Sequence, residues 1–373
     1  MPSGLIVLEW RTMSRNVLSF LLLASVVLLC GCLFSVNVPI VAPDGTIAVF
    51  LEQHGGYKLF PEVGVLHLLR GSEWVSVPAA VLSGAGGLMD LSPDGSELLY
   101  IDIRSGEFLD PLESTVYRVA LQPDAVPVVV LETEGVIAKA SWTDDGRILL
   151  LEFGEEASAS LELLDPVTGE KERLFDDLLS FEISQDRRTL TLIGVDSEVT
   201  IGRVERWDPA SGRRTELATL CLGEASTESF AMLPHSFLWD VSPDGRWLAV
   251  ALYDTTVLEP AVESDLPSLY LIDTEYDTAE RIAVDAVMPS FSPEGDGLIY
   301  LRTSDGETGV VMWHELESGI STGVPGSEGV STAFWLSPGR LGMTFEARDD
   351  FARLVQLDLA SGEKRELVAV PHE

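Results

Sequence analysis

Lysine and cysteine are scarce in this chain of 373 residues, and each shortage narrows its possible functions. The chain has 24 basic residues, only four of them lysines, against 60 acidic residues, so its formal net charge is -36. Binding to a phosphate backbone requires clustered positive charge, so this composition argues against a nucleic-acid-binding protein. The three cysteines, Cys30, Cys32 and Cys221, are too few for a disulfide scaffold.

Common catalytic signatures are also missing. The chain has no Gly-x-Ser-x-Gly elbow, no His-Glu-x-x-His motif, no Cys-x-x-Cys pair and no glycine-rich phosphate loop. The carboxylates are too numerous for sequence alone to identify a catalytic pair. The five histidines are far apart along the chain, at His54, His67, His235, His314 and His372. The sequence therefore favours a protein without catalytic activity.

The composition is nevertheless that of a folded protein. Hydrophobic residues make up 46% of the chain and the mean hydropathy is +0.21, which excludes one long disordered acidic segment. An acidic composition with few lysines is typical of a salty habitat or of a GC-rich genome, and both remain open. In both cases the acidic surface is predicted to keep the protein soluble, to be repelled by anionic lipid, and to attract cations or basic partners.

The first 31 residues have the pattern of a secretory signal peptide. Arg11 and Arg15 precede an uncharged apolar run over residues 17–29. The following stretch Leu29-Cys30-Gly31-Cys32 resembles the lipobox of bacterial lipoproteins, although Cys30 departs from its usual small or aliphatic residue. The resemblance implies cleavage before Cys32 and lipidation of that cysteine. An uncleaved membrane anchor and a plainly secreted form are the alternatives, and Met1 and Met13 both remain possible starts.

In all three cases, as a lipoprotein, with an uncleaved anchor or as a secreted form, the domain that follows is exported from the cytoplasm. Removal of residues 1–31 leaves 22 basic and 59 acidic residues, hence a net charge of -37, and Cys221 as the single thiol. No disulfide within the mature chain is then available, so its stability must come from a hydrophobic core.

A five-residue turn motif, as in Leu91-Ser92-Pro93-Asp94-Gly95, recurs along the rest of the chain. In such a turn Pro presets its φ, Asp accepts a hydrogen bond from the backbone two residues ahead, and Gly adopts a positive φ. The motif aspartates Asp44, Asp94, Asp145, Asp186 and Asp244 are therefore interpreted as turn formers. The seven copies occupy residues 41–45, 91–95, 142–146, 183–187, 241–245, 291–295 and 336–339, a period near 50 that indicates a repeat array.

Each repeat predicts four short strands, with a second kind of turn at residues 165–170, 208–212 and 358–363. No helical period of useful length follows the signal. Repeated four-stranded units are typical of a β-propeller. We therefore predict an all-β fold, a β-propeller of about seven four-stranded antiparallel blades, in one domain over residues 32–373. The motif is degenerate at 185–187 and at 338–339, so six or eight blades remain open. The last unit has four strands of its own, so we expect the ring to close by packing, without a shared blade.

The Ser-Pro-Asp-Gly and Asp-x-x-Ser-Gly-Glu turns resemble the WD-like repeats of TolB-type propellers over about residues 33–370. The resemblance implies a protein of the bacterial cell envelope, in the periplasm or at the cell surface. Leu33 after the lipidated cysteine resembles an outer-membrane sorting signal.

The up-and-down order of strands places both repeated turns on one face of the ring. The long segments 52–64, 104–115, 221–235 and 254–267 then share the opposite face, where we expect a protein or peptide to bind. The alternative is that their aromatic residues only hold their own loops in place. The candidate binding residues of this long-loop face are Tyr57, Phe60, Phe108, Phe230, Met232, His235, Glu259 and Glu263.

Acidic residues recur three places before the third motif position. Asp90, Glu182 and Asp240 are predicted to lie on innermost strands, where their carboxylates could bind a hard cation such as Ca²⁺. The alternative is that each accepts hydrogen bonds from neighbouring backbone. No other cofactor is expected.

The leading hypothesis is a non-catalytic, lipid-anchored, extracytoplasmic propeller that serves as a scaffold for a protein or peptide partner. A second hypothesis is an enzyme of the lactonase or glycan-cleaving kind, with carboxylates or a divalent cation in the channel. A third is a structural component of a larger assembly.

Overall fold

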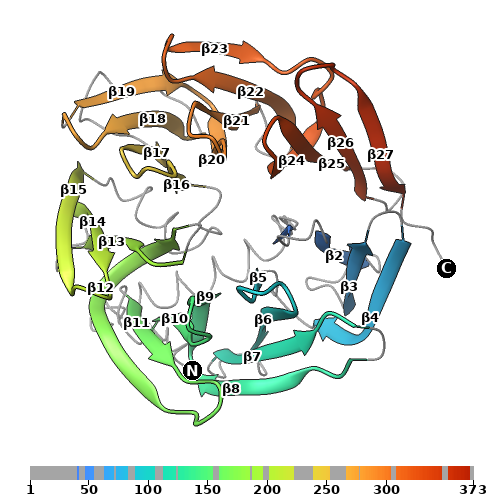
Figure 1. Ribbon diagram of the computed structural model, residues 1–373, viewed down its shortest axis with the longest axis vertical. Helices are drawn as coiled ribbons and strands as arrows, with labels where there is room; N and C mark the ends of the chain where they lie inside the picture. Colours follow the sequence, from blue (N-terminus) through green and yellow to red (C-terminus); the bar gives the residue numbers. More distant parts are fainter. Residues whose placement is uncertain are drawn as a thin grey trace, which may run out of the picture.

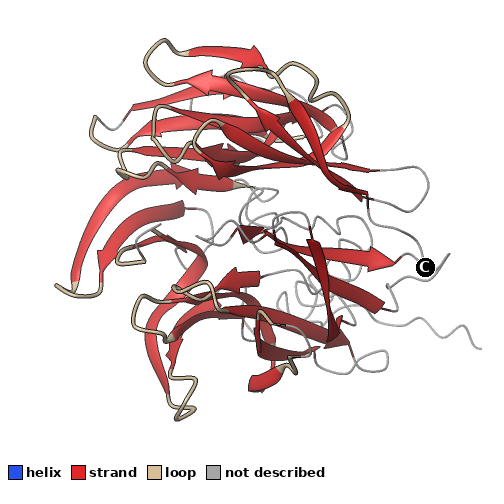
Figure 2. Cartoon of the chain, turned by 45° about the vertical axis from the view of Figure 1, so that its right-hand side comes forward, coloured by secondary structure: helices blue, strands red, loops and turns tan. Residues whose placement is uncertain are grey.

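The computed structural model is built from β-strands arranged in a ring (Figures 1 and 2). Its 27 described strands are accompanied by no helix in the part of the chain that the structure describes. That part comprises residues 40–41, 47–53, 63–70, 73–82, 89–105, 112–122, 125–153, 159–184, 187–195, 201–221, 238–252, 266–276, 278–303, 308–346 and 352–369.

The strands fall into consecutive groups of four, which we number as blades 1 to 7. Blade 1 contains β1 (Ile40–Val41), β2 (Ile47–Gln53), β3 (Val63–Arg70) and β4 (Glu73–Leu82). Blade 2 contains β5 (Met89–Leu91), β6 (Glu97–Ser105), β7 (Leu112–Ala120) and β8 (Val128–Glu134). Blade 3 contains β9 (Val136–Trp142), β10 (Ile148–Phe153), β11 (Ala159–Leu164) and the first part of β12 (Lys171–Ile183).

Blade 4 contains the second part of β12, β13 (Leu190–Val195), β14 (Ile201–Asp208) and β15 (Arg213–Cys221). Blade 5 contains β16 (Trp239–Val241), β17 (Trp247–Leu252), β18 (Ser268–Asp273) and β19 (Thr278–Ala283). Blade 6 contains β20 (Ala286–Phe291), β21 (Gly297–Thr303), β22 (Gly309–Glu315) and β23 (Ile320–Gly323). Blade 7 contains β24 (Val330–Ser337), β25 (Arg340–Glu346), β26 (Ala352–Asp358) and β27 (Lys364–Ala369).

This arrangement confirms the predicted propeller and its seven antiparallel blades, including the two whose motif is degenerate. Blades 3 and 4 share the long strand β12, which pairs with β11 up to Leu178 and with β13 from that residue onward. A positive φ of 56° at Asp177 accompanies this change of partner. Among the described strands, none of blade 1 pairs with one of blade 7, so no blade is shared between the two ends, as expected, and closure by packing stays a prediction.

The hydrophobic core lies between adjacent blades. Strand β10 has five buried residues of six, so both of its faces are covered. One cluster joins Leu99 and Val116 of blade 2 to Ile137 and Leu150 of blade 3. Burial on both faces explains why the second strand of several blades is a nearly continuous apolar run and not an alternating one.

The motif turns have the predicted chemistry. In blade 2, the Asp94 carboxylate accepts a hydrogen bond from the Ser96 N–H at 3.0 Å, and Gly95 has a φ of 69°. The hydrogen bond from the Ser92 hydroxyl, with further bonds from Ser96, lowers the pKa of Asp94 to about 2. The Ser92 hydroxyl also accepts the Glu97 N–H at 2.9 Å, a role that the sequence analysis missed.

The outermost strands repeat a second feature, a β-bulge at an apolar residue. The residues skipped in the pairing register are Val130 of β8, Leu174 of β12, Leu217 of β15, Ile282 of β19 and Leu367 of β27. Each of the five is half-buried. The bulge therefore gives equivalent positions on the outer edges of five blades.

Candidate functional site

The residues predicted to form the long-loop face lie outside the part of the chain that the structure describes. Tyr57, Phe60, Phe108, Phe230, Met232, His235, Glu259 and Glu263 all lie outside the described residues, as does the predicted lipidation site Cys32. The binding role of this face and the lipid anchor stay predictions.

The three acidic residues predicted on the innermost strands do lie there, on β5, β12 and β16. Asp90 accepts hydrogen bonds from the N–H groups of Leu91 and Trp142, both at 2.8 Å. Trp142 is the first motif residue of the next blade, so the carboxylate connects blade 2 to blade 3.

Asp240 makes the same connection three blades later. It accepts hydrogen bonds from the N–H of Val241 at 2.8 Å and from that of Phe291 at 2.7 Å. Phe291 is again the first motif residue of the next blade, here blade 6. These contacts are the backbone bonds that the sequence analysis gave as the alternative to a cation site.

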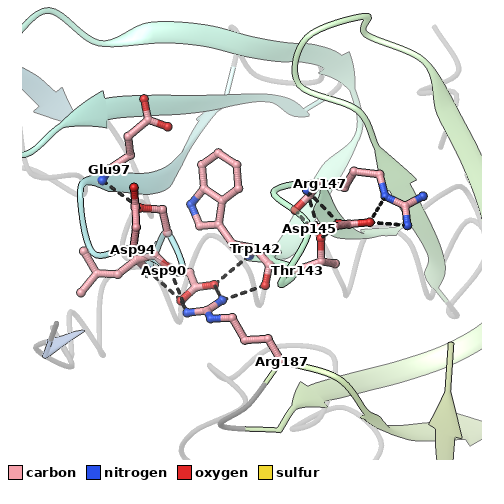
Figure 3. Close-up of polar contacts among 10 residues, drawn as sticks. Asp90, Asp94, Glu97, Trp142, Thr143, Asp145, Arg147 and Arg187 are labelled. Atoms are coloured by element: carbon pink, nitrogen blue, oxygen red, sulfur yellow. Dashed lines mark hydrogen bonds and ion pairs between the residues drawn. The ribbon is translucent and has the colours of Figure 1, made fainter. Parts of the chain in front are cut away.

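Arg187 completes the site around Asp90, and the sequence analysis did not single it out (Figure 3). Its guanidinium forms a two-point ion pair with Asp90, at 2.8 Å to Oδ2 and 2.9 Å to Oδ1. It also donates to the carbonyl oxygens of Trp142 at 2.7 Å and Leu91 at 2.8 Å. One side chain from blade 4 thus binds blades 2 and 3 together.

The backbone at Arg187 explains why the motif is degenerate in blade 4. Arg187 occupies the position of the motif glycine and has a φ of 57°, close to the 69° of Gly95 and Gly245. A non-glycine residue in this region is strained by about 1–2 kcal/mol. The four hydrogen bonds of the guanidinium offset that strain.

A second polar group surrounds Glu182. The Lys139 ammonium lies 2.5 Å from Glu182 Oε1 and donates to the carbonyl oxygen of Phe181 at 2.9 Å. Burial raises the pKa of Asp240 to about 7, and the charge of Glu182 acts in the same direction. The hydrogen bonds from Phe291 and Val241 and the charge of Lys139 oppose that rise without cancelling it. Asp240 therefore titrates near neutral pH.

These contacts define what the site can do. Asp90 and Glu182 each have a cationic partner, and Asp240 has two backbone donors. Within the described ranges, no group of three or more His, Cys, Asp or Glu side chains is arranged to hold a metal ion. The Ca²⁺ site stays a prediction, whereas the ion pairs and the connections between blades are structural facts.

Comparison with known proteins identifies the fold. The β-propeller domain of the trilobed protease from Pyrococcus furiosus is similar, with 14% identity, 88% of this chain and 96% of that chain covered, and a TM-score of 0.55. The periplasmic gluconolactonase PpgL from Pseudomonas aeruginosa has 15% identity, 87% and 96% coverage and a TM-score of 0.51. TolB from Acinetobacter baumannii has 12% identity, 87% and 77% coverage and a TM-score of 0.46.

No family model matches the chain, and no curated protein sequence does. Among the residues that the structure describes, no helix is long and apolar enough to span a membrane. At identities this low the solved structures show a shared fold and nothing about activity. The predicted β-propeller fold is thus confirmed.

Arg187 can be tested by separating its contacts from its backbone strain. We expect Arg187→Ala, which loses the ion pair and keeps the positive φ, to lower the free energy of unfolding by about 2–4 kcal/mol. Arg187→Gly also removes the strain and should cost about 1 kcal/mol less. Urea unfolding measures both, with Arg203→Ala on the exposed face of β14 as the control. Equal losses in the control and in Arg187→Ala would show that the ion pair does not hold the blades.

Asp240 gives the stability a pH dependence of known sign. Its ordinary pKa is 3.8 and its folded pKa is about 7, so the folded state keeps a proton that the unfolded state has lost. The resulting stabilisation is full below pH 4 and is lost as the pH rises to 7. The stability of Asp240→Asn relative to the wild type should therefore rise between pH 4.5 and pH 7, by up to about 1.4 kcal/mol per pH unit.

The control for this measurement is Asp94→Asn. The pKa of Asp94 is lowered to about 2, so its contribution changes only below pH 4. Unfolding free energies at pH 4.5, 6 and 7.5 should give a constant difference between this variant and the wild type. If Asp240→Asn also gives a constant difference, then Asp240 does not titrate near neutral pH.

Proposed function

We propose that the chain is a non-catalytic, extracytoplasmic, lipid-anchored β-propeller that binds a protein or peptide on its long-loop face. The observation that supports this proposal most is that the polar groups around Arg187 already bind one another and the backbone. They lie at the end of the ring that carries the motif turns, and they are engaged with one another and with the backbone. That end is therefore better explained as a structural closure than as a reactive centre.

The opposite end of the ring is therefore the better candidate for binding a partner. The two longest connections of the chain follow Cys221 of β15 and Leu252 of β17, and both start from strand ends that lie opposite the motif turns. Long connections on a rigid scaffold are where proteins place their binding residues. The net charge of -36 favours a basic partner, because complementary charge speeds encounter and excludes acidic competitors.

A partner pull-down tests the binding proposal. A soluble Cys32→Ser form should retain a specific protein from detergent-solubilised envelope, and alanines at Phe108, Phe230 and Met232 should reduce that protein at least tenfold. The matched control replaces Val167 and Tyr276, which are 86% and 65% exposed in turns of the opposite face, by alanine. Equal retention by the loop variant and the control would remove the claim for the long-loop face.

The lipid anchor has a separate test. Mass spectrometry of the mature protein should find acyl groups on an N-terminal Cys32, and Cys32→Ser should release the protein from the membrane fraction. An intact start at Met1 or Met13 would contradict the anchor and leave the binding proposal standing.

A second candidate is a channel enzyme of the lactonase or glycan-cleaving kind. The observation that favours it is Asp240, a carboxyl group that titrates near neutral pH beside Glu182 and Lys139. A periplasmic gluconolactonase among the solved structures of this fold adds support. A rise of several degrees in melting temperature with millimolar Ca²⁺ or Mn²⁺, abolished in Asp240→Asn, would favour this candidate over the scaffold.

A further inference from the structure

The outer edge of blade 2 differs from the other outer edges of the ring. Strand β8 is the last in the sheet order β5-β6-β7-β8, at the bottom of the ring in Figure 1. Val128 and Val129 on this strand are 51% and 48% exposed, and Val126 just before it is 74% exposed. Among the described strands β8 pairs with β7 alone, so its outer edge presents exposed valines, which a folded protein usually avoids at a sheet edge.

The repeated bulge gives an internal comparison for this patch. In four other blades, the two residues before the bulge include at least one charged side chain. The pairs are Glu172-Arg173, Thr215-Glu216, Glu280-Arg281 and Arg365-Glu366. Charged residues at such positions prevent an edge from pairing with another chain. Blade 2 alone among these five places two valines there, so its edge has lost that protection.

The remaining two blades protect their edges differently. Strand β23 of blade 6 has only four residues, and β4 of blade 1 is interrupted by Pro78. Short edge strands and proline both hinder the addition of a further strand. Strand β8 has seven residues, and the nearest proline, Pro127, precedes it.

The second half of β8 is acidic. Glu132 and Glu134 are exposed, and Glu113 of β7 lies directly opposite Glu134 in the register. Like charges directly opposite one another destabilise a sheet. Among the side chains that the structure describes, no arginine or lysine forms an ion pair with Glu132 or Glu134, whereas Glu113 lies opposite Arg104 of β6 in the register. The edge therefore offers apolar contact at one end and unneutralised negative charge at the other.

We propose that β8 binds an extended segment of a basic partner protein, which adds to blade 2 as a fifth strand. Apolar side chains of the segment pack on Val128 and Val129, and its lysines or arginines neutralise Glu132 and Glu134. Backbone hydrogen bonds to the open edge supply affinity, and the side chains supply selectivity. A second copy of this chain fits poorly, because it brings the same glutamates and a charge of -36 to the contact.

The sheet sets the direction of the segment. The strands of blade 2 are antiparallel, so an added strand that continues the pattern runs opposite to β8. Its first residues then face Glu132 and Glu134, and its last residues face Val128. The matching segment has basic residues first and apolar residues last. This edge is separate from the long-loop face, and its test does not depend on that proposal.

The probe is a fluorescent ten-residue peptide with two lysines in its first half and alternating valine and threonine in its second half. We expect saturable binding to the full chain in detergent, measured by anisotropy, and at least tenfold weaker binding of the peptide in reversed order. Val128→Glu with Val129→Arg installs the pair that blades 3 and 5 carry at this position, so it should fold normally. It should weaken binding at least tenfold.

The acidic half is tested by Glu132→Gln with Glu134→Gln, which should weaken binding several-fold and reduce its salt dependence. The matched control is Glu172→Gln with Glu363→Gln, two exposed glutamates of other blades, which should change nothing. Amide hydrogen exchange of residues 128–134 should slow when the peptide binds. Absence of binding at millimolar peptide, or binding unchanged by the valine replacement, overturns the proposal. A dimer that the valine replacement abolishes also overturns it, because a second copy then occupies the edge.

Discussion

A blade of four strands cannot bury both of its faces by itself, and the rest of this structure depends on that constraint. Strands such as β10 and β21 are buried on both sides, so each blade needs a neighbour on each side. A ring is the arrangement that gives every blade two neighbours. The described strands of blades 1 and 7 do not pair, so no shared blade joins the two ends of the ring, and the contacts between neighbouring blades are what hold the described blades together.

The polar contacts at the axis follow from the same constraint. Two of the innermost strands, β5 and β16, have only three residues each, so they offer few apolar side chains to the next blade. Asp90 and Asp240 compensate by accepting N–H groups across the blade boundary. Their charges then need partners. Arg187 supplies one for Asp90. Asp240 has no cationic partner in direct contact among the described residues, and burial raises its pKa to about 7.

Local patterns made the fold predictable, and distant contacts made the site hard to predict. The turn aspartates bond to backbone two residues ahead, as Asp94 does to Ser96, so a short stretch of sequence contains both partners. Arg187 and Asp90 are 97 residues apart, and no local pattern joins them. One signal was present: an arginine where the other copies of the motif have glycine. A non-glycine residue with a positive φ is strained. Its presence at a position that usually holds glycine indicates that its side chain makes a contact that stabilises the fold.

The outer edges of the blades must be protected from pairing with other chains. Closing a propeller removes no edge, because every blade still ends in an outermost strand with unpaired backbone groups. Because the blades are repeats, their outer edges are equivalent. A blade whose edge lacks the protection found in the others therefore calls for an explanation of its own. Charge at the bulge, a short strand and an internal proline each protect an edge, and β8 itself has none of them, because Pro127 precedes the strand. An unprotected edge risks aggregation, so the exposed valines of β8 are best explained by a partner that covers them.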